Sequence, residues 1–348
     1  MRFAFTAEQI AIRDTVRAML ARECTGEHVR SAWAMDDGRA PGLWAKLAEL
    51  GVPGMLAPET HGGLGLTEIE LVLVLEESGR VALPEPLLET AAVAVPVLRD
   101  AVAHATGERW LRAVAAGEAV AAVVLEGTGE GWIAGLAQAD VALVGRGGEL
   151  HLVEGPARTL EHHGSIDGSR RLARWTSMPA ASTCLAVGDA AAGAIADARD
   201  RAAVGAAAQL VGLARGMLQR AVDYVKARQQ FGKPVGSFQA VKHHLADALV
   251  AVDMAAPTVY RAAYSLAHRD PERGAHASMA KALASDAATL VARKALQCHG
   301  AIGYAFENDL QLWMKRAWAL SAAWGDAAWH RERVGRAIFE DRTAAGDP

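Results

Sequence analysis

Residues 297–307 read Gln-Cys-His-Gly-Ala-Ile-Gly-Tyr-Ala-Phe-Glu, and the rest of the chain is organised around them. An alanine-rich helical pattern leads into this stretch, and Gly300 and Gly303 break the pattern before a carboxylate, Glu307. Because glycine permits positive φ angles and a close approach of backbone to a ligand, the loop can aim Glu307 into a cavity as a catalytic base. A helix C-cap followed by a surface acid has the same residues, so the stretch alone leaves both interpretations open.

The helical period extends from Asp189 almost to the end of the chain and predicts four or five long helices. Glycine or proline breaks the pattern near residues 232–234, 270–271, 300–303 and 325. Small residues such as Gly205, Gly212 and Gly216 line the first helix of this region. They allow close helix approach, either within an antiparallel bundle or across an oligomer interface.

The residues before this region predict two further units. Capping-box spacings, Thr6 with Gln9 and Thr67 with Glu70, begin helical patterns in an all-helical first part. Short β-branched runs then follow at 119–125, 141–144, 150–153 and 183–187, and Gly145, Gly147 and Gly148 predict a hairpin turn. The predicted domains are an N-terminal helical domain (1–118), a small middle β domain (119–188) and a C-terminal helical bundle (189–348).

Composition excludes several classes of function. With a net charge of -4 over 348 residues, the chain offers no electrostatic case for binding nucleic acid or an anionic membrane. No segment reaches about 18 uncharged apolar residues, and the first residues lack the pattern of a signal peptide. The widely spaced cysteines indicate reduced thiols, and the pairs His162-His163 and His243-His244 lack a third metal ligand. We therefore expect a cytoplasmic protein without a metal site.

Three sequence motifs accompany this domain order. The first is Trp44…Leu47…Leu50-Gly51…Pro58-Glu59…Gly62-Gly63-Leu64-Gly65, with Glu76-Glu77-Ser78-Gly79-Arg80 after it. The second, more specific, is Tyr224-Val225-Lys226-Ala227-Arg228-Gln229-Gln230-Phe231-Gly232-Lys233-Pro234. The third is the opening stretch, Gln297…Gly300…Gly303-Tyr304…Glu307. Over nearly the whole chain, these motifs and this domain order resemble the acyl-CoA dehydrogenases. The resemblance implies a mainly α fold with a small β domain: an N-terminal helical domain, a middle β barrel or sandwich and a C-terminal antiparallel helical bundle.

The resemblance also implies FAD as the cofactor. Arg228 and Phe231 would contact FAD, in this family often the FAD of a neighbouring subunit, and an arginine suits a pyrophosphate. From its position alone, Arg228 could instead cap a helix C-terminus. Gln297, Gly300 and Gly303 would shape the adenosine–pyrophosphate side of the site.

Glu307 would be the catalytic base of the family reaction, the α,β-dehydrogenation of an acyl-CoA thioester. It would remove the pro-R α-proton while the β-hydride passes to flavin N5, which requires a desolvated carboxylate and a polarised thioester carbonyl. Some family members carry the base on the helix before the arginine motif, but that region here, residues 201–203, is Arg-Ala-Ala. Glu307 is therefore the sole candidate at a family position.

The sequence departs from the family at two flavin-contacting segments. The family's Thr-Glu-Pro…Gly-Ser-Asp segment is missing from residues 122–132, where Glu126 and Thr128 are possible remnants. The family's Glu-Gly-Thr-x-Gln segment is replaced by Trp324-Gly325-Asp326-Ala327-Ala328-Trp329. Because the flavin lies between subunits in this family, a chain that keeps only one side of the site can still complete the site of a partner.

We therefore expect one subunit of a heteromeric acyl-CoA dehydrogenase, acting in fatty-acid or steroid degradation. A bulky or steroid side-chain thioester is one candidate substrate, a paralogous chain is the expected partner, and electron-transfer flavoprotein or a similar protein is the expected electron acceptor. One alternative is a non-catalytic subunit that completes the FAD site of a paralogous acyl-CoA dehydrogenase chain. Another is a relative that uses the fold for a different reaction, such as a flavin-dependent oxidation, or for binding.

Overall fold

The computed structural model describes residues 4–344 except 102–103, 127–130, 156–159, 178 and 180. Its first part is helical, as predicted, and both capping boxes form: Thr6 caps with Gln9, and Thr67 caps with Glu70. A π-helical turn, η2, lies between helices in this part. The elements are α1 (Ala7–Glu23), α2 (Gly26–Ala34), α3 (Leu43–Glu49), η1 (Glu59–His61), α4 (Glu68–Arg80), η2 (Leu88–Ala94), α5 (Val95–Asp100) and α6 (Ala105–Ala115).

The middle part holds two small sheets, ordered β1-β3-β4-β7 and β2-β6-β5. The elements are β1 (Ala121–Leu125), β2 (Ile133–Ala134), η3 (Leu136–Gln138), β3 (Val141–Arg146), β4 (Glu149–Glu154), β5 (Leu160–His163), β6 (Leu172–Trp175) and β7 (Thr183–Val187). Gly147 and Gly148 make the β3–β4 turn, both at positive φ. Gly145, which we predicted in that turn, lies within β3 instead. A glycine is needed there because a Cβ would lie 2.6 Å from the side chain of Ile195.

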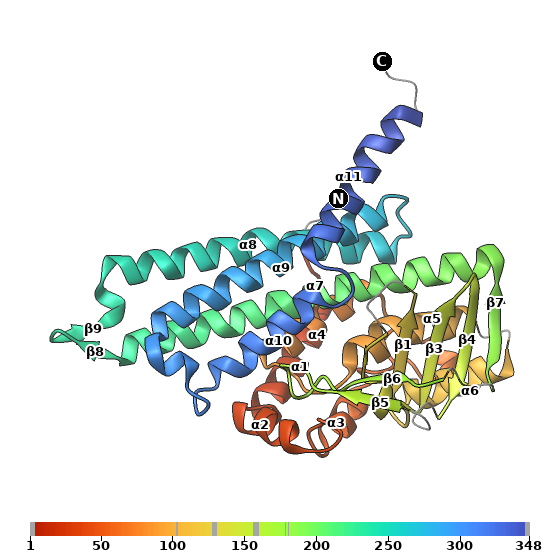
Figure 1. Ribbon diagram of the computed structural model, residues 1–348, viewed down its shortest axis with the longest axis horizontal. Helices are drawn as coiled ribbons and strands as arrows, with labels where there is room; N and C mark the ends of the chain where they lie inside the picture. The colour runs from red at the N-terminus through yellow and green to blue at the C-terminus, as the bar shows by residue number, and fades with distance from the viewer. Residues whose placement is uncertain are drawn as a thin grey trace.

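The remaining chain forms long helices broken near each predicted glycine or proline site. The elements are α7 (Gly188–Ala227), β8 (Gln229–Gln230), β9 (Lys233–Pro234), η4 (Val235–Ser237), α8 (Gln239–Ala267), α9 (Arg273–His299), η5 (Gly300–Tyr304), α10 (Leu310–Ala322) and α11 (Ala327–Ala344). In Figure 1, α7, α8 and α9 run side by side, with the β8–β9 hairpin at one end and the β1-β3-β4-β7 sheet toward the other. The predicted fold class, mainly α with a small β region between helical regions, is confirmed.

The small residues of α7 serve packing within the chain. A Cβ on Gly212 would lie 1.8 Å from the Glu76 carbonyl of α4, and a Cβ on Gly205 would lie 2.3 Å from Leu88 of η2. Of the two predicted uses of these residues, the structure therefore shows close helix approach inside one chain.

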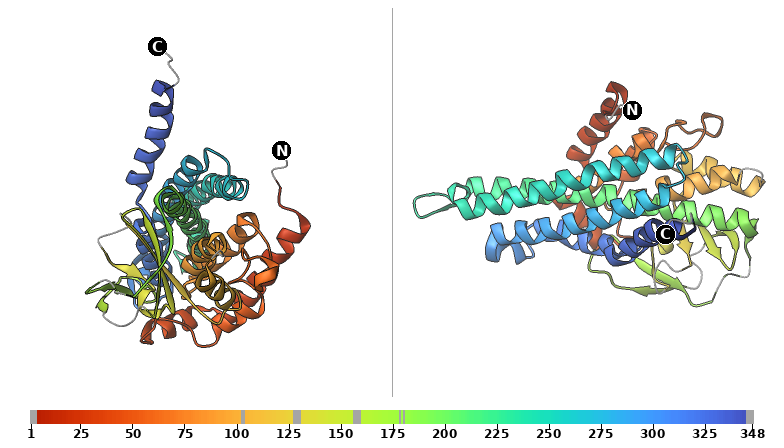
Figure 2. Two further views of the ribbon diagram at one scale, coloured as in Figure 1. Left: turned by 90° about the vertical axis from the view of Figure 1, so that its right-hand side faces the viewer. Right: turned by 90° about the horizontal axis from the view of Figure 1, so that it is seen from above.

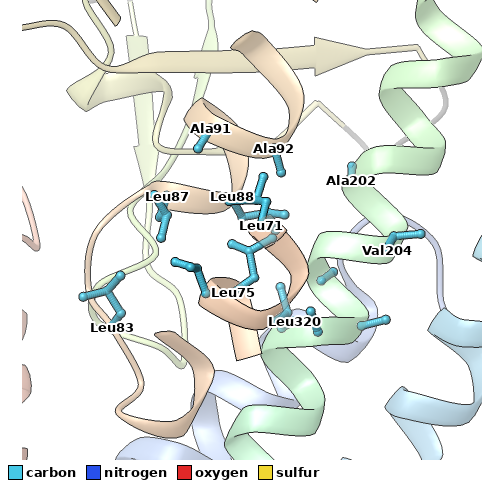
Figure 3. Close-up of a cluster of buried hydrophobic side chains, with 14 of the residues drawn as sticks. Leu71, Leu75, Leu83, Leu87, Leu88, Ala91, Ala92, Ala202, Val204 and Leu320 are labelled. Carbon is cyan, nitrogen blue, oxygen red and sulfur yellow. The ribbon is translucent and has the colours of Figure 1, made fainter. Parts of the chain in front are cut away.

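Leucines fill the core between α4, η2 and α7 (Figure 3). Leu71 and Leu75 of α4 and Leu88 of η2 are buried against Ala202 and Val204 of α7. An opening beside Leu71 and Val204 has a volume of about 20 Å³, which suits a water molecule rather than an acyl chain.

Helix α11 projects from the body, as Figure 1 and the left view of Figure 2 show. No helix in the described part of the chain combines the length and the apolar character that a bilayer crossing needs.

Candidate functional site

An open groove lies where the end of α7, the start of α8 and the end of α9 meet. Its volume is about 410 Å³. It is lined by Tyr224, Arg228, Gln230, Val235, Ala240, Val241, His244, Gln297, Cys298, His299 and Gly300. The structure thus brings together three of the predicted cofactor residues, Arg228, Gln297 and Gly300, from elements far apart in the sequence.

The groove suits an anionic group. Arg228 is exposed, and within the described part of the chain no carboxylate forms an ion pair with it and no acidic residue lines the groove. Gly300 has φ +66, and a Cβ there would meet no atom within 4 Å, so the space beside its backbone is open. These features fit the pyrophosphate of FAD, which Arg228 and the open backbone at Gly300 would hold.

Gly303 does not reach the groove. It is buried, its φ is not positive, and a Cβ there would lie 2.8 Å from Leu296 Cδ1. The prediction that Gly303 shapes the adenosine side is not supported by this position, because the glycine is needed for packing between η5 and the end of α9.

One wall of the groove is a stacked pair of rings that the sequence did not reveal. Tyr224 and His299 stack with centroids 4.5 Å apart and planes 16° apart. His299 Nδ1 donates to the Ala295 carbonyl at 2.8 Å, and burial lowers the pKa of His299, so its ring is neutral. A neutral aromatic stack beside Arg228 offers a flat, uncharged surface next to a cationic one.

Phe231 lies outside this groove, in the turn between β8 and β9. Its side chain is 90% exposed, and its ring stands at 88° to the ring of Phe238 with the ring centroids 6.1 Å apart. The two loop residues, Phe231 and Gly232, have φ +51 and +75, which is the conformation of a type I′ turn. A large exposed aromatic held in such a turn is available to another molecule.

Glu307 is exposed on the loop between η5 and α10, and it lines neither the groove nor the pocket described below. Arg30 of α2 holds this loop by donating to the carbonyls of Phe306 and Glu307 at 2.6 and 3.2 Å. Arg30 also pairs with Asp309. The loop is therefore docked on α2, and the described residues of this chain do not provide the desolvated surroundings expected for a catalytic carboxylate.

A second open pocket, of about 440 Å³, lies between the middle sheets and α10. It is lined by Val123, Trp132, Ile133, Ala134, His163, Gly164, Ser165, Ile166, Arg170, Leu172, Ala319, Ala322, Ala323 and Trp324. No carboxylate is among these residues. Of the possible remnants of the missing family segment, Glu126 is exposed and accepts from the Gly147 amide at 3.1 Å, whereas Thr128 lies outside the described residues.

Buried polar groups hold Trp324 in the wall of this pocket. Trp324 has φ +60, an angle that costs about 1–2 kcal/mol for a residue other than glycine. Lys281 donates to the carbonyls of Ser321 and Gly325 at 3.0 and 2.9 Å, and His330 Nε2 donates to the Trp324 carbonyl at 3.0 Å. The turn that replaces the family's flavin-contacting segment is therefore firmly anchored.

Two family domains match the sequence. The acyl-CoA dehydrogenase N-terminal domain matches residues 6–118, and the acyl-CoA dehydrogenase C-terminal domain matches residues 193–339. Acyl-CoA dehydrogenase IpdE2 of Mycobacterium tuberculosis is 32% identical over 311 residues, which are 89% of this chain and 91% of that protein. The chain belongs to the acyl-CoA dehydrogenase family.

Solved structures share the fold of this acyl-CoA dehydrogenase chain. A variant of the Tcur3481-Tcur3483 steroid ACAD has a TM-score of 0.84 at 25% identity, covering 97% of this chain and 99% of its own. The ChsE4-ChsE5 complex from Mycobacterium tuberculosis has a TM-score of 0.84 at 23% identity, covering all of both chains.

Family membership confirms three predictions: the acyl-CoA dehydrogenase resemblance, the oxidoreductase class acting on the CH–CH bond of acyl-CoA thioesters, and FAD as the family's cofactor. As for metals, the residues that the structure describes contain no cluster of three His, Cys, Asp or Glu side chains that could hold an ion.

Proposed function

We propose that this chain is one subunit of a heteromeric acyl-CoA dehydrogenase, and that its Arg228–Gln297 groove completes the FAD site of a paralogous chain. The observation that carries the proposal is the separation of the groove from the chain's own pocket. Lys281 of α9 donates a hydrogen bond to the turn beside Trp324, in the wall of the pocket. Gln297, also of α9, lines the groove. Gln297 follows Lys281 by sixteen positions on α9, a distance of about 24 Å at the rise of an α-helix.

This separation supports our proposal that the two surfaces serve different cofactor molecules. The groove lies near the hairpin end of the helices, away from the β1-β3-β4-β7 sheet (Figure 1). A flavin whose adenosine–pyrophosphate half lies in the groove therefore takes the contacts of its ring from another chain. Bound FAD supplies the hydride-accepting chemistry, while Arg228 and the open backbone at Gly300 bind and orient its pyrophosphate.

Three observations support a paralogous partner rather than a second copy of this chain. Glu307 is exposed and its loop is docked on α2. No carboxylate is among the described residues that line the chain's own pocket. The core between α4, η2 and α7 is filled by leucines (Figure 3). The partner chain would therefore supply the base and hold the acyl group, which is the non-catalytic alternative among our predictions.

The relatives guide the choice of partner and substrate. Two of the structures with this fold are named as complexes of two different chains, ChsE4-ChsE5 and Tcur3481-Tcur3483, and the second is named a steroid ACAD. A steroid side-chain acyl-CoA is therefore the first substrate to test with the assembled complex, and electron-transfer flavoprotein the first electron acceptor.

Flavin stoichiometry tests the proposal. The chain would be purified alone and after co-expression with a paralogous acyl-CoA dehydrogenase chain, and the ratio of released FAD to protein measured for each. We expect a flavin-poor chain alone and a yellow complex with fewer flavins than chains. A stoichiometric, active yellow homotetramer would contradict the proposal. Within the complex, Arg228→Gln should lower the FAD content, whereas Arg146→Gln, at an exposed arginine of β3, should not.

A further inference from the structure

A relay of three side chains reaches the groove from α8 and α9. Lys294 of α9 donates to Asp247 Oδ2 at 2.9 Å and to His244 Nδ1 at 3.1 Å. His244 and Asp247 are three residues apart on α8 and so lie on one face of that helix. His244 also lines the groove, together with Arg228 and Gln297. The relay therefore connects a surface carboxylate to the wall of the groove.

The relay determines which nitrogen of His244 carries the proton. An ammonium group has three donors and no acceptor, so Nδ1 of His244 must present its lone pair to Lys294. The imidazole is then neutral, with its proton on Nε2. Asp247 fixes Lys294 in turn, and the hydrogen bond from Lys294 holds the pKa of Asp247 below its usual value. His244 thus offers the groove an N–H donor.

We infer that His244 is a cofactor-binding residue of the groove, donating from Nε2–H to the adenylate half of FAD, and that Lys294 and Asp247 are its positioning residues. The inference rests on the proposed function of the groove. Arg228 comes from the end of α7, whereas His244 comes from α8. The two donors would hold the same anion from different walls, and Lys294 adds a second positive charge close behind His244.

The adjacent histidine provides a matched control. His243 is exposed, does not line the groove, and has Nε2 3.1 Å from the Gln239 amide nitrogen. His243 and His244 thus share a helix and a residue type, while only His244 has the relay behind it. A substitution that acts by disturbing α8 as a whole would have the same effect at either histidine.

The test is ADP binding by the full chain, measured by calorimetry for the wild type and for His244→Phe, His244→Gln, His243→Phe and Arg228→Gln. His244→Phe should weaken ADP binding about tenfold or more, because it removes a hydrogen bond to a charged group. His244→Gln retains an N–H donor and should recover most of the affinity. His243→Phe should bind ADP as the wild type does.

A second readout follows the tautomer itself. In ¹⁵N NMR spectra of the imidazole, wild-type His244 should be the Nε2–H form, and Lys294→Met should produce a mixture of tautomers and a weaker affinity for ADP. The inference is overturned if His244→Phe binds ADP normally while Arg228→Gln does not, an outcome that leaves the proposed function intact. Equal losses in His244→Phe and His243→Phe also overturn it. If the wild-type chain binds no ADP and the complex contains no FAD, both proposals fail.

Discussion

Lys281 is a fully buried amine whose charge should make the stability of the chain depend on pH. Burial lowers the pKa of Lys281 to about 7. Below pH 7 both the folded and the unfolded chain carry the proton, whereas between pH 7 and the ordinary lysine value near 10.5 only the unfolded chain does. The folded state therefore gains stability as the pH rises through this window, by up to about 1.4 kcal/mol per pH unit.

Lys281→Met removes this proton linkage together with the hydrogen bonds to Ser321 and Gly325. We expect the variant to be less stable than the wild type at pH 9, with the difference shrinking as the pH falls toward 7. Urea unfolding of both proteins at several pH values between 6.5 and 9.5 measures the difference. Lys242→Met, at an exposed lysine of α8, is the control and should show no such trend. A pH-independent difference for Lys281→Met would mean that the buried amine does not titrate in this range.

At the scale of elements, the sequence predicted the helix starts and the breaks between helices, which local signals encode. Thr6 and Thr67 begin helices because their capping partners lie three residues along the chain, and the glycine and proline breaks between helices are equally local. The strands β5 and β6 were missed because residues 160–175 are rich in polar and turn-forming residues, so only tertiary packing makes them strands. The parallel pairing of β1 with β3 is likewise set by long-range contacts.

The β8–β9 hairpin holds Phe231 in a costly backbone conformation that the contacts of the chain do not explain. Phe231 occupies a left-handed position, with φ +51, where asparagine is preferred, and its ring is 90% exposed. Phe231→Asn relieves about 1 kcal/mol of backbone strain and loses an exposed edge contact with Phe238 of about the same size. We therefore expect the free energy of unfolding to change by less than about 1 kcal/mol, while the FAD content of the complex falls.

Urea unfolding of the chain and FAD release from the complex measure these two quantities. Unchanged FAD content in the Phe231→Asn complex would show that the ring does not contact the cofactor, and its exposure would then need another explanation. Lys233→Asn, on the same hairpin, reports any effect of altering the hairpin without removing the aromatic ring.

At the scale of the whole molecule, residues that the sequence pattern had grouped together lie at different places in the structure. Arg228, Gln297 and Gly300 meet in one groove because the helices α7 and α9 end at the same place. Glu307 follows Gly300 closely in sequence, yet Arg30 holds its loop on α2, and Gly303 is turned into the packing. Tyr224, His244 and His299 stand in stretches that the sequence singled out, but their contacts could not be predicted, since their partners come from other helices. A motif can therefore identify the family without showing which chain supplies the catalytic base and which chain contacts the cofactor.

Glu307→Gln in the assembled complex tests directly which chain supplies the catalytic base. If the partner chain supplies the base, the variant should reduce its flavin with acyl-CoA at the wild-type rate, because Glu307 is exposed and lines no described pocket. Removing a true general base costs about 10²–10⁴-fold in rate, so the two outcomes are well separated in a stopped-flow measurement of flavin bleaching. Asp309→Asn would serve as a loop control, since it weakens the Arg30 contact while leaving Glu307 in place. A loss of that size in Glu307→Gln alone would restore Glu307 as the base, and the groove and the catalytic carboxylate would then belong to one chain.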